Sequence, residues 1–273
     1  QTPNRWILGV FFMSNAMHVA KTGLNAQNKR MQVISNNLAN VNTTGFKRDR
    51  ANFESLLYQV LKTSGAQTTG ETRTTSGFNV GTGVKIINTD KLFTQGNIIT
   101  TDNALDIAID GSGFFQILNP DGTLSYSRAG TFGKSAEGLL TTPSGYILQP
   151  EIEIPEGVTS INISSDGIVS VQVPGQVDAE EVGQLQLADF ANPTGLQPIG
   201  QNLLIETPAS GPPIVENPFT NGFGKLVQGA LESSNVNVVQ ELVDMIETQR
   251  AYEINSKAIS GVDDMLRFVN QNL

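Results

Sequence analysis

Carboxylates are the residues of this chain whose spacing comes closest to a chemical motif. Asp102, Asp106 and Asp110 recur every four residues in the segment TDNALDIAIDGSG, which superficially resembles a calcium loop. An EF-hand, however, requires a glycine at its sixth position and a glutamate at its twelfth, and this segment has neither pattern. Apolar and polar residues alternate through 105–109, which is typical of a β-strand with aspartates at its ends. We therefore predict turn-forming aspartates and no metal site.

Other catalytic arrangements find little support. The chain has one histidine, His18, and no cysteine, which excludes most Ser-His and Cys-His schemes, disulfides and thiolate metal sites. Glu151 and Glu153 share one face of a predicted strand, but few aromatic residues lie near them in sequence to hold a sugar. The glycine-rich segments 81–83 and 111–113 do not join a strand to a helix, as a phosphate loop would. We predict neither catalysis nor a cofactor.

The composition favours a structural protein. The 273 residues are 38% hydrophobic, 7% aromatic and 16% charged, and much of the remainder is Gly, Ser, Thr, Asn and Gln. Such a mixture suits short strands with many turns, and amide-rich surfaces that hydrogen-bond to copies of themselves. The net charge of -9 argues against binding to nucleic acid. The apolar run 6–12 is too short to span a bilayer, and we assign residues 1–12 to an upstream extension.

Apolar residues at seven-residue spacing predict a helix at each end of the chain. Two narrow seams result, with the members Leu24, Met31, Ile34, Leu38, Val41, Val238, Met245, Tyr252, Ile259, Val262, Leu266 and Val269. We expect the first five to pair with Tyr252, Ile259, Val262, Leu266 and Val269, which would bring both chain ends to one side of the molecule. The alternative is that each helix packs separately on a globular core. A second short helix is expected at about 50–61.

Between the helices the sequence indicates β-structure. Turn dipeptides such as Asp110-Gly111 and Asp166-Gly167 separate short apolar runs. The predicted strands are 84–87, 105–109, 114–118, 139–140, 146–148, 152–154, 161–163, 168–173, 185–190 and 203–206. The predicted fold is α+β, with N- and C-terminal helices that form a coiled-coil pair and a mainly antiparallel all-β middle module. The predicted parts are N-terminal axial helices (13–62), a Thr/Gly-rich excursion (63–83), β-structure (84–232) and a C-terminal axial helix (233–273).

Two terminal segments, AQNKRMQVISNNLANVNTTGFKR (26–48) and SSNVNVVQELVDMIETQRAYEINSKAIS (233–260), resemble the paired signatures of the flagellar axial proteins of the rod and hook. The residues that carry the resemblance are Asn36, Asn37, Leu38, Ala39, Asn40, Gly45, Phe46, Gln249, Arg250, Ala251 and Tyr252. The middle segment 106–132 also resembles the β element that this family shares. His18 departs from the family, which commonly has Trp in the first helix.

The resemblance implies a self-assembling subunit of the bacterial flagellum basal body, with no catalytic site. It implies a helical homo-oligomer whose terminal helices line an inner tube, and export through the flagellar type III apparatus. The length and the segment 58–84 resemble the distal rod members, the drive shaft that carries torque from the motor to the hook. The implied partners are proximal rod proteins, the hook protein, and the peptidoglycan and outer-membrane ring proteins around the rod. A proximal rod or hook-type subunit and, more remotely, a glycan-binding β-sandwich are the alternatives.

Overall fold

The structure is a computed structural model that describes residues 4–62, 77–175 and 178–271. Its chain divides into two compact units. The helical unit consists of residues 1–38, 49–90 and 238–273, and the β unit consists of residues 39–48 and 91–237. Each unit draws on segments that are far apart in the sequence.

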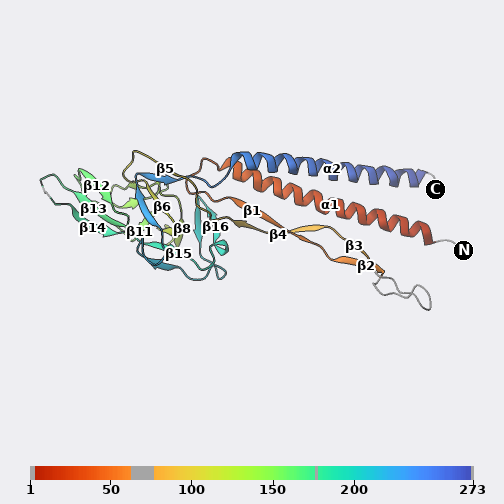
Figure 1. The fold of residues 1–273 in the computed structure, drawn as a ribbon, viewed down its shortest axis with the longest axis horizontal. Coiled ribbons are helices and arrows are strands. Elements are labelled where there is room, and N and C mark those ends of the chain that lie inside the picture. The colour runs from red at the N-terminus through yellow and green to blue at the C-terminus, as the bar shows by residue number, and fades with distance from the viewer. Residues whose placement is uncertain (1–3, 63–76, 176–177, 272–273) are drawn as a thin grey trace. The chain divides into compact units, whose positions relative to one another are not determined.

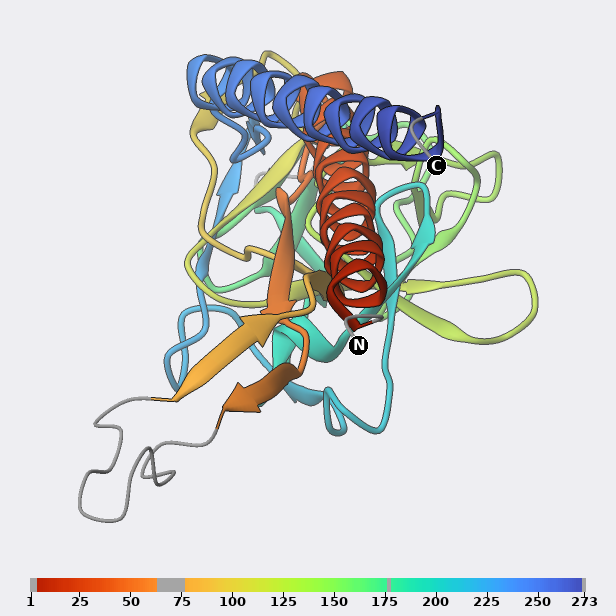
Figure 2. The same cartoon turned by 90° about the vertical axis from the view of Figure 1, so that its right-hand side faces the viewer.

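Two long helices dominate the helical unit, as the heptad spacing predicts (Figure 1). Helix α1 spans Asn4–Ala39 and α2 spans Val238–Gln271. The two helices lie closest where α1 ends and α2 begins, and they separate toward the chain termini (Figures 1 and 2). Residues 4–12, which we assigned to an upstream extension, form the first turns of α1. That assignment stays a prediction.

Two short strand pairs complete the helical unit. Strand β1 (Asp49–Ser55) pairs with β4 (Val84–Lys91), and β2 (Tyr58–Lys62) pairs with β3 (Phe78–Gly81). The helix predicted at 50–61 was therefore wrong. Cross-strand side chains explain the difference: Arg50 contacts Asp90 at 2.9 Å, and Asn52 donates to Asp90 at 2.7 Å and to Asn88 at 3.0 Å. These partners lie about forty residues away, beyond the reach of a local pattern.

The β unit is built around one nine-stranded sheet. Its central path is β16-β17-β8-β7-β11-β10-β9, and β15 pairs with both β7 and β18. The members are β7 (Phe114–Leu118), β8 (Leu124–Ser127), β9 (Gly133–Lys134), β10 (Leu140–Thr141), β11 (Ile147–Gln149), β15 (Leu187–Asp189), β16 (Gln197–Gly200), β17 (Leu203–Ile205) and β18 (Ile214–Glu216). All these pairs are antiparallel. A 3-10 turn, η1 (Pro193–Gly195), precedes β16.

Smaller sheets surround this one. Strands β12 (Ser160–Ile163), β13 (Ile168–Gln172) and β14 (Glu180–Gln184) form an antiparallel sheet of three. Two further antiparallel pairs join early and late parts of the chain: β5 (Ile98–Thr100) with β20 (Ala230–Glu232), and β6 (Ile107–Asp110) with β19 (Lys225–Gln228). The α+β class, with terminal helices around a mainly antiparallel middle, is thus confirmed.

Apolar residues of the β unit form two buried clusters, one around Phe115 and Leu187 and one around Tyr126 and Phe190. Phe115 and Leu187 are completely buried and lie opposite each other in the β7–β15 pair. Phe115 meets Phe132 edge to face at 5.0 Å, and Tyr126 meets Phe190 in the same way at 4.7 Å. Burial of this kind is the main stabilising contribution to a domain of this size. Most predicted strands overlap observed ones, but 152–154 is an isolated bridge through Glu153 rather than a strand.

Candidate functional site

The described part of the chain contains no cluster of three or more His, Cys, Asp or Glu side chains that could hold a metal ion. Asp106 is buried and accepts hydrogen bonds from Thr101 Oγ1 at 2.8 Å and Asn103 Nδ2 at 3.0 Å. Asp110 pairs with Lys225 at 3.2 Å. These contacts give Asp106 and Asp110 partners within the protein. None of the described helices has a stretch apolar and long enough to cross a bilayer.

The two helices contact each other through polar side chains. Asn37 donates to Glu241 Oε2 at 3.3 Å, and Arg30 lies 3.6 Å from Asp244. Nearer the chain termini, Gly23 faces Asn255, whose amide would touch any Cβ added at position 23. The helices therefore run antiparallel. On the α2 side the inward-facing Glu241 and Thr248 are completely buried.

Most predicted seam residues are only half-buried in a single chain. Ile34 is 4% exposed, whereas Val238 and Tyr252 are each 39% exposed. The half-buried members are Leu24, Met31, Leu38, Val41, Met245, Ile259, Val262 and Leu266. The Val269 side chain lies outside the described residues.

The antiparallel register changes the pairing that we expected. Residues 244–255 of α2 face residues 23–30 of α1, and Glu241 faces Asn37. Ile259, Val262 and Leu266 therefore lie beyond Gly23, where the two helices separate (Figures 1 and 2). They cannot face Ile34 or Leu38 within one chain, because a helix of fixed rise keeps them about 30 Å further along. A continuous apolar seam between the helices stays a prediction for the assembled state.

Asn37 joins the end of α1 to the start of β1. Its Nδ2 donates to the Asp49 carbonyl at 2.9 Å, and its Oδ1 accepts from the Asp49 amide at 2.9 Å. The side chain thus satisfies both backbone groups of one residue, as a neighbouring strand would. Asn36 adds a weaker contact of 3.3 Å to the Asp49 carboxylate. These two motif residues fix the position of β1 relative to the end of α1.

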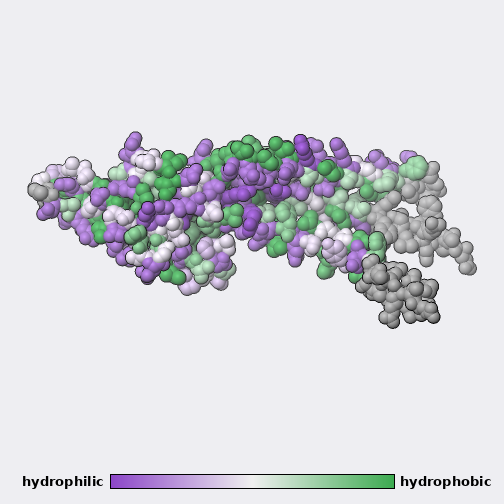
Figure 3. Space-filling model, in the orientation of Figure 1, coloured by the Kyte–Doolittle hydropathy of each residue, from purple (hydrophilic) through white to green (hydrophobic). Residues whose placement is uncertain are grey.

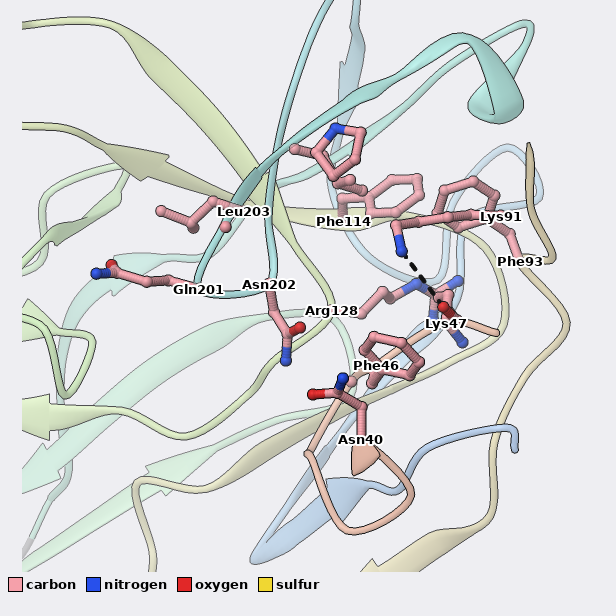
Figure 4. A pocket seen from close by; sticks show the side chains of 14 residues that line it. Asn40, Phe46, Lys47, Lys91, Phe93, Phe114, Arg128, Gln201, Asn202 and Leu203 are labelled. Atoms are coloured by element: carbon pink, nitrogen blue, oxygen red, sulfur yellow. Dashed lines mark hydrogen bonds between the residues drawn. The ribbon is translucent and has the colours of Figure 1, made fainter. Parts of the chain in front are cut away.

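The motif loop, residues 40–47, belongs to the β unit and is held there by backbone contacts. Gly45 has φ +68° and donates to the Glu232 carbonyl at 2.8 Å. A Cβ at position 45 would lie 2.5 Å from the backbone nitrogen of Ala129, so only glycine fits. The next residue, Phe46, is buried, and the Lys91 ammonium lies 5.0 Å from its ring centroid (Figure 4).

The last residue of this loop, Lys47, belongs to a buried ion cluster with Arg128 and Glu232. Lys47 Nζ is 2.6 Å from Glu232 Oε1 and 2.9 Å from the Thr94 carbonyl. Arg128 Nη1 lies 3.4 Å from Glu232 Oε2, and Nη2 donates to the Gly111 carbonyl at 2.7 Å. The cluster joins three segments that the sequence separates widely.

Burial is the main influence on the pKa values of both basic residues in this cluster. Burial lowers the pKa of Lys47 below its ordinary value; Glu232 opposes this effect and Arg128 adds to it. Burial likewise lowers the pKa of Arg128, again against the attraction of Glu232. Removing one partner of such a buried group leaves an uncompensated charge and is strongly destabilising.

Asn235, just before α2, plays the same bridging part in the β unit as Asn37 plays in the helical unit. Its Oδ1 accepts from the Arg48 amide at 2.7 Å. Its Nδ2 donates to the carbonyls of Leu92 at 2.8 Å and Thr94 at 3.0 Å. The sequence marks Asn235 only as a candidate N-cap of the C-terminal helix, and the ion cluster was not among the residues that we singled out. The available signal was a lone glutamate inside the apolar strand Ala230–Glu232.

The C-terminal motif behaves differently from the N-terminal one. Gln249 and Arg250 are exposed, Ala251 is half-buried and Tyr252 is 39% exposed. A folded single chain therefore leaves most of this motif at its surface. In the N-terminal motif, by contrast, Asn37, Gly45 and Phe46 are buried and have structural roles, Leu38 and Asn40 are half-buried, and Ala39 is exposed.

Three segments of the chain match families of known proteins. Residues 17–47 match the family described as flagella basal body rod protein, and residues 227–272 match flagellar basal body rod FlgEFG protein C-terminal. Residues 108–171 match flagellar hook protein FlgE/F/G D1 domain. The chain is 51% identical to the flagellar basal-body rod protein FlgG of Buchnera aphidicola subsp. Acyrthosiphon pisum over 259 residues, which is 95% of this chain and 100% of the relative. The chain belongs to the FlgG family.

More distant members extend the match over the same length. The FlgG protein of Agrobacterium fabrum is 45% identical over 94% of this chain and 99% of its own. The FlgG protein of Bacillus subtilis is 36% identical over 93% of this chain and 97% of its own. Membership of the FlgG family identifies a structural subunit of the rod in the flagellar basal body, and not an enzyme.

Proposed function

We propose that copies of this chain assemble through their terminal helices into a helical homo-oligomer, the distal rod, which transmits torque from motor to hook. The observation that carries the proposal is the near absence of an interior in the helical unit. Among its described residues, Ala26 and Ile34 are the only buried hydrophobic side chains. A unit of two long helices with so little buried apolar surface needs further contacts to be stable.

The first turns of α2 offer a surface for those contacts. Val239, Leu242, Val243 and Ile246 form an apolar face of α2 at helical spacing, and they are 71%, 44%, 45% and 50% exposed. Figure 3 shows apolar side chains gathered over the start of α2. The side of α2 that faces α1 carries Glu241 and Asp244 instead. The apolar face therefore lies on the side of α2 away from α1.

A second copy is the partner that fits this surface best. The family builds rods, and subunits in a helical lattice each meet several neighbours. Covering the remaining exposure of each of the four side chains contributes on the order of 1 kcal/mol. Repeated over many neighbours, contacts of this size lock a shaft that must not bend under torque. The exposed Arg250 lies at helical spacing with Val243 and Ile246 on the same side of α2, and it supplies a polar contact in the same interface.

The remaining partners follow from the resemblance to the axial proteins. We assign proximal rod and hook proteins to the ends of the rod, and peptidoglycan and outer-membrane ring proteins to its outside, across the periplasm. Export uses the flagellar type III apparatus. We also assign residues 63–82 of the excursion to a bridge between adjacent subunits; residues 63–76 of it lie outside the described residues. Tyr58, on the strand that leads into it, and Phe78, on a strand within it, are 62% and 56% exposed.

The experiment is assembly of the purified chain, followed by negative-stain electron microscopy and sedimentation. We expect straight, rigid tubes from the wild-type chain above a critical concentration. Val243→Glu places a charge in the apolar face and should abolish assembly, because a buried unpaired carboxylate is strongly unfavourable. The isolated variant should keep its helix content and melting temperature, since Val243 is already 45% exposed.

Ser256→Glu is the matched control. Ser256 is exposed and lies about 220° around α2 from Val243. We expect this variant to assemble as the wild-type chain does. Curved, flexible tubes would favour a hook-type subunit, and normal assembly of Val243→Glu would exclude the apolar face of α2 as the contact.

A further inference from the structure

A cavity of about 220 Å³ opens beside the motif loop, entirely within the β unit. Its apolar walls are formed by Phe46, Phe93, Phe114, Leu203 and Leu204. Figure 4 shows Lys47, Lys91 and Arg128 converging at one end of the cavity. No carboxylate is among the residues that line it. The cavity thus combines an apolar body with a cationic end.

Arg128 supplies a hydrogen-bond donor that has no acceptor in the described part of the chain. Its side chain is 6% exposed, and its guanidinium lies 5.4 Å from the centroid of the Phe114 ring. Nη1 and Nη2 have acceptors, but Nε is buried without a hydrogen-bond partner among the described residues. A buried donor on a cation without an acceptor is costly and is rare in folded proteins.

The charges around this donor are also unbalanced. The ion pairs of Lys47 and Arg128, as far as the described residues show, both end on Glu232. Asp189 attracts Arg128 only from a greater distance. Two buried cations thus share one close carboxylate. A second carboxylate would balance the charge and accept from Nε in a charge-assisted hydrogen bond.

The mouth of the cavity is accessible and its shape is fixed. Pro198, Gly200 and Gln201 at the rim are exposed. Gln201 and Asn202 both have left-handed backbones, at φ 54° and 58°. This turn is tied down at both sides, because Ser127 Oγ donates to the Asn202 carbonyl at 2.9 Å and Asn202 Nδ2 donates to the Thr44 carbonyl at 2.9 Å. A rim held in this way is pre-organised for an occupant.

We infer that in the assembled rod this cavity receives an Asp or Glu side chain from a second copy of the chain. The inference rests on the proposed self-assembly. The cavity is smaller than the roughly 300–1,000 Å³ typical of small-molecule sites, and it suits one protein side chain. Charge complementarity points the same way, since each copy carries 26 acidic against 17 basic residues. Nε has no accessible surface in the free chain, so the occupant's carboxylate binds it as the guanidinium shifts toward the cavity. The occupant's methylene groups pack against the phenylalanines.

The experiment compares critical concentrations for assembly, with phenylacetate as a soluble carboxylate probe and phenylacetamide as its neutral counterpart, at constant ionic strength. We expect phenylacetate to raise the melting temperature of the monomer and to raise the critical concentration about tenfold. Phenylacetamide should do neither. Arg128→Lys keeps a cation beside Glu232 but removes Nε, so it should lose the phenylacetate response and assemble less well.

Pro198→Trp covers the mouth of the cavity from an exposed position, and it tests the inference even where Arg128→Lys fails to fold. Pro174→Trp, at an exposed turn of the same unit, is its matched control. We expect Pro198→Trp, but not Pro174→Trp, to raise the critical concentration. If Arg128→Lys and Pro198→Trp assemble as well as the wild-type chain, the inference is wrong, whereas the proposed function still stands. A phenylacetate effect on the monomer without any effect on assembly would assign the cavity to free carboxylates and overturn the second-copy occupant. Failure of the wild-type chain to assemble would overturn the proposed function, and the inference with it.

Discussion

The two units of this chain bury their apolar residues to very different degrees. In the β unit, Ile107, Phe115 and Leu187 are completely buried, and they belong to one continuous cluster. In the helical unit, 36- and 34-residue helices bury little more than Ala26 and Ile34 among their described residues. The large hydrophobic residues exposed there include Val239, Ile254 and Phe268.

The two units are therefore stabilised in different ways. The β unit contains its own stabilising core, as an independently folding domain must. The helical unit is held within one chain by polar contacts such as Asn37–Glu241 and Arg30–Asp244, and it exposes the apolar surface that a neighbour would cover. A subunit of a filament benefits from this division, because its assembly surface becomes stable only when assembly occurs.

The largest effect that tests the comparison is expected in the β core. Leu187→Ala should lower the free energy of unfolding of the β unit by about 2–5 kcal/mol, because it leaves a cavity beside Phe115. Ile34→Ala should leave the unfolding of the β unit unchanged and should reduce amide protection only in the helical unit. Urea titration with hydrogen exchange resolved by peptide measures both changes in the monomer.

Two outcomes would break the comparison. Loss of protection throughout the β unit in Ile34→Ala would mean that the two units unfold as one. An unchanged β unit in Leu187→Ala would mean that its interior tolerates a cavity and is not the stabilising core. Either result would contradict the view that the β unit is stable by itself and that the helical unit becomes stable only on assembly.

The helices and much of the β-structure could be predicted from sequence because their signals are local. Heptad spacing extends through most of each helix, and Asp-Gly dipeptides mark the end of strand 107–110 and the start of strand 168–172. The segment 50–61 was misread because Phe53, Leu57 and Val60 fall near helical spacing. Its strand structure depends on residues 78–81 and 84–91, and no local pattern reveals this pairing.

A second, intermediate effect concerns the junction between α1 and β1. Asn37→Ala should lower the stability of the helical unit by about 1–3 kcal/mol, because both backbone groups of Asp49 lose their partner. Faster hydrogen exchange at residues 49–52 in the monomer is the measurement. Asn36→Ala, which removes an exposed contact of 3.3 Å, is the control and should have a smaller effect. Equal effects of the two variants would mean that the Asn37 contacts do not hold β1 to the end of α1.

The motif residues were identified from sequence, but their roles were not. Resemblance singled out Gly45 and Phe46, yet the need for glycine arises from the close approach of Ala129, more than eighty residues away. The ion cluster is harder still, because Lys47, Arg128 and Glu232 meet only in the folded β unit. Buried charges that are drawn together from distant segments leave almost no periodic signal.

The smallest expected effect is a pH dependence that sharpens the account of the β interior. Burial lowers the pKa of Lys47 in the folded chain below 10.5, its ordinary value. Between the lowered pKa and 10.5, the unfolded chain retains a proton that the folded chain has released, so this residue makes the free energy of unfolding rise with pH. Lys47→Met lacks the contribution. The stability difference between the wild-type chain and Lys47→Met should therefore widen as pH increases toward 10.5, measured by urea denaturation of both monomers. A difference that narrows instead would show that Glu232 holds the proton more strongly than burial expels it. The cluster would then be a well-compensated ion pair, and the case for a missing carboxylate beside Arg128 would weaken with it.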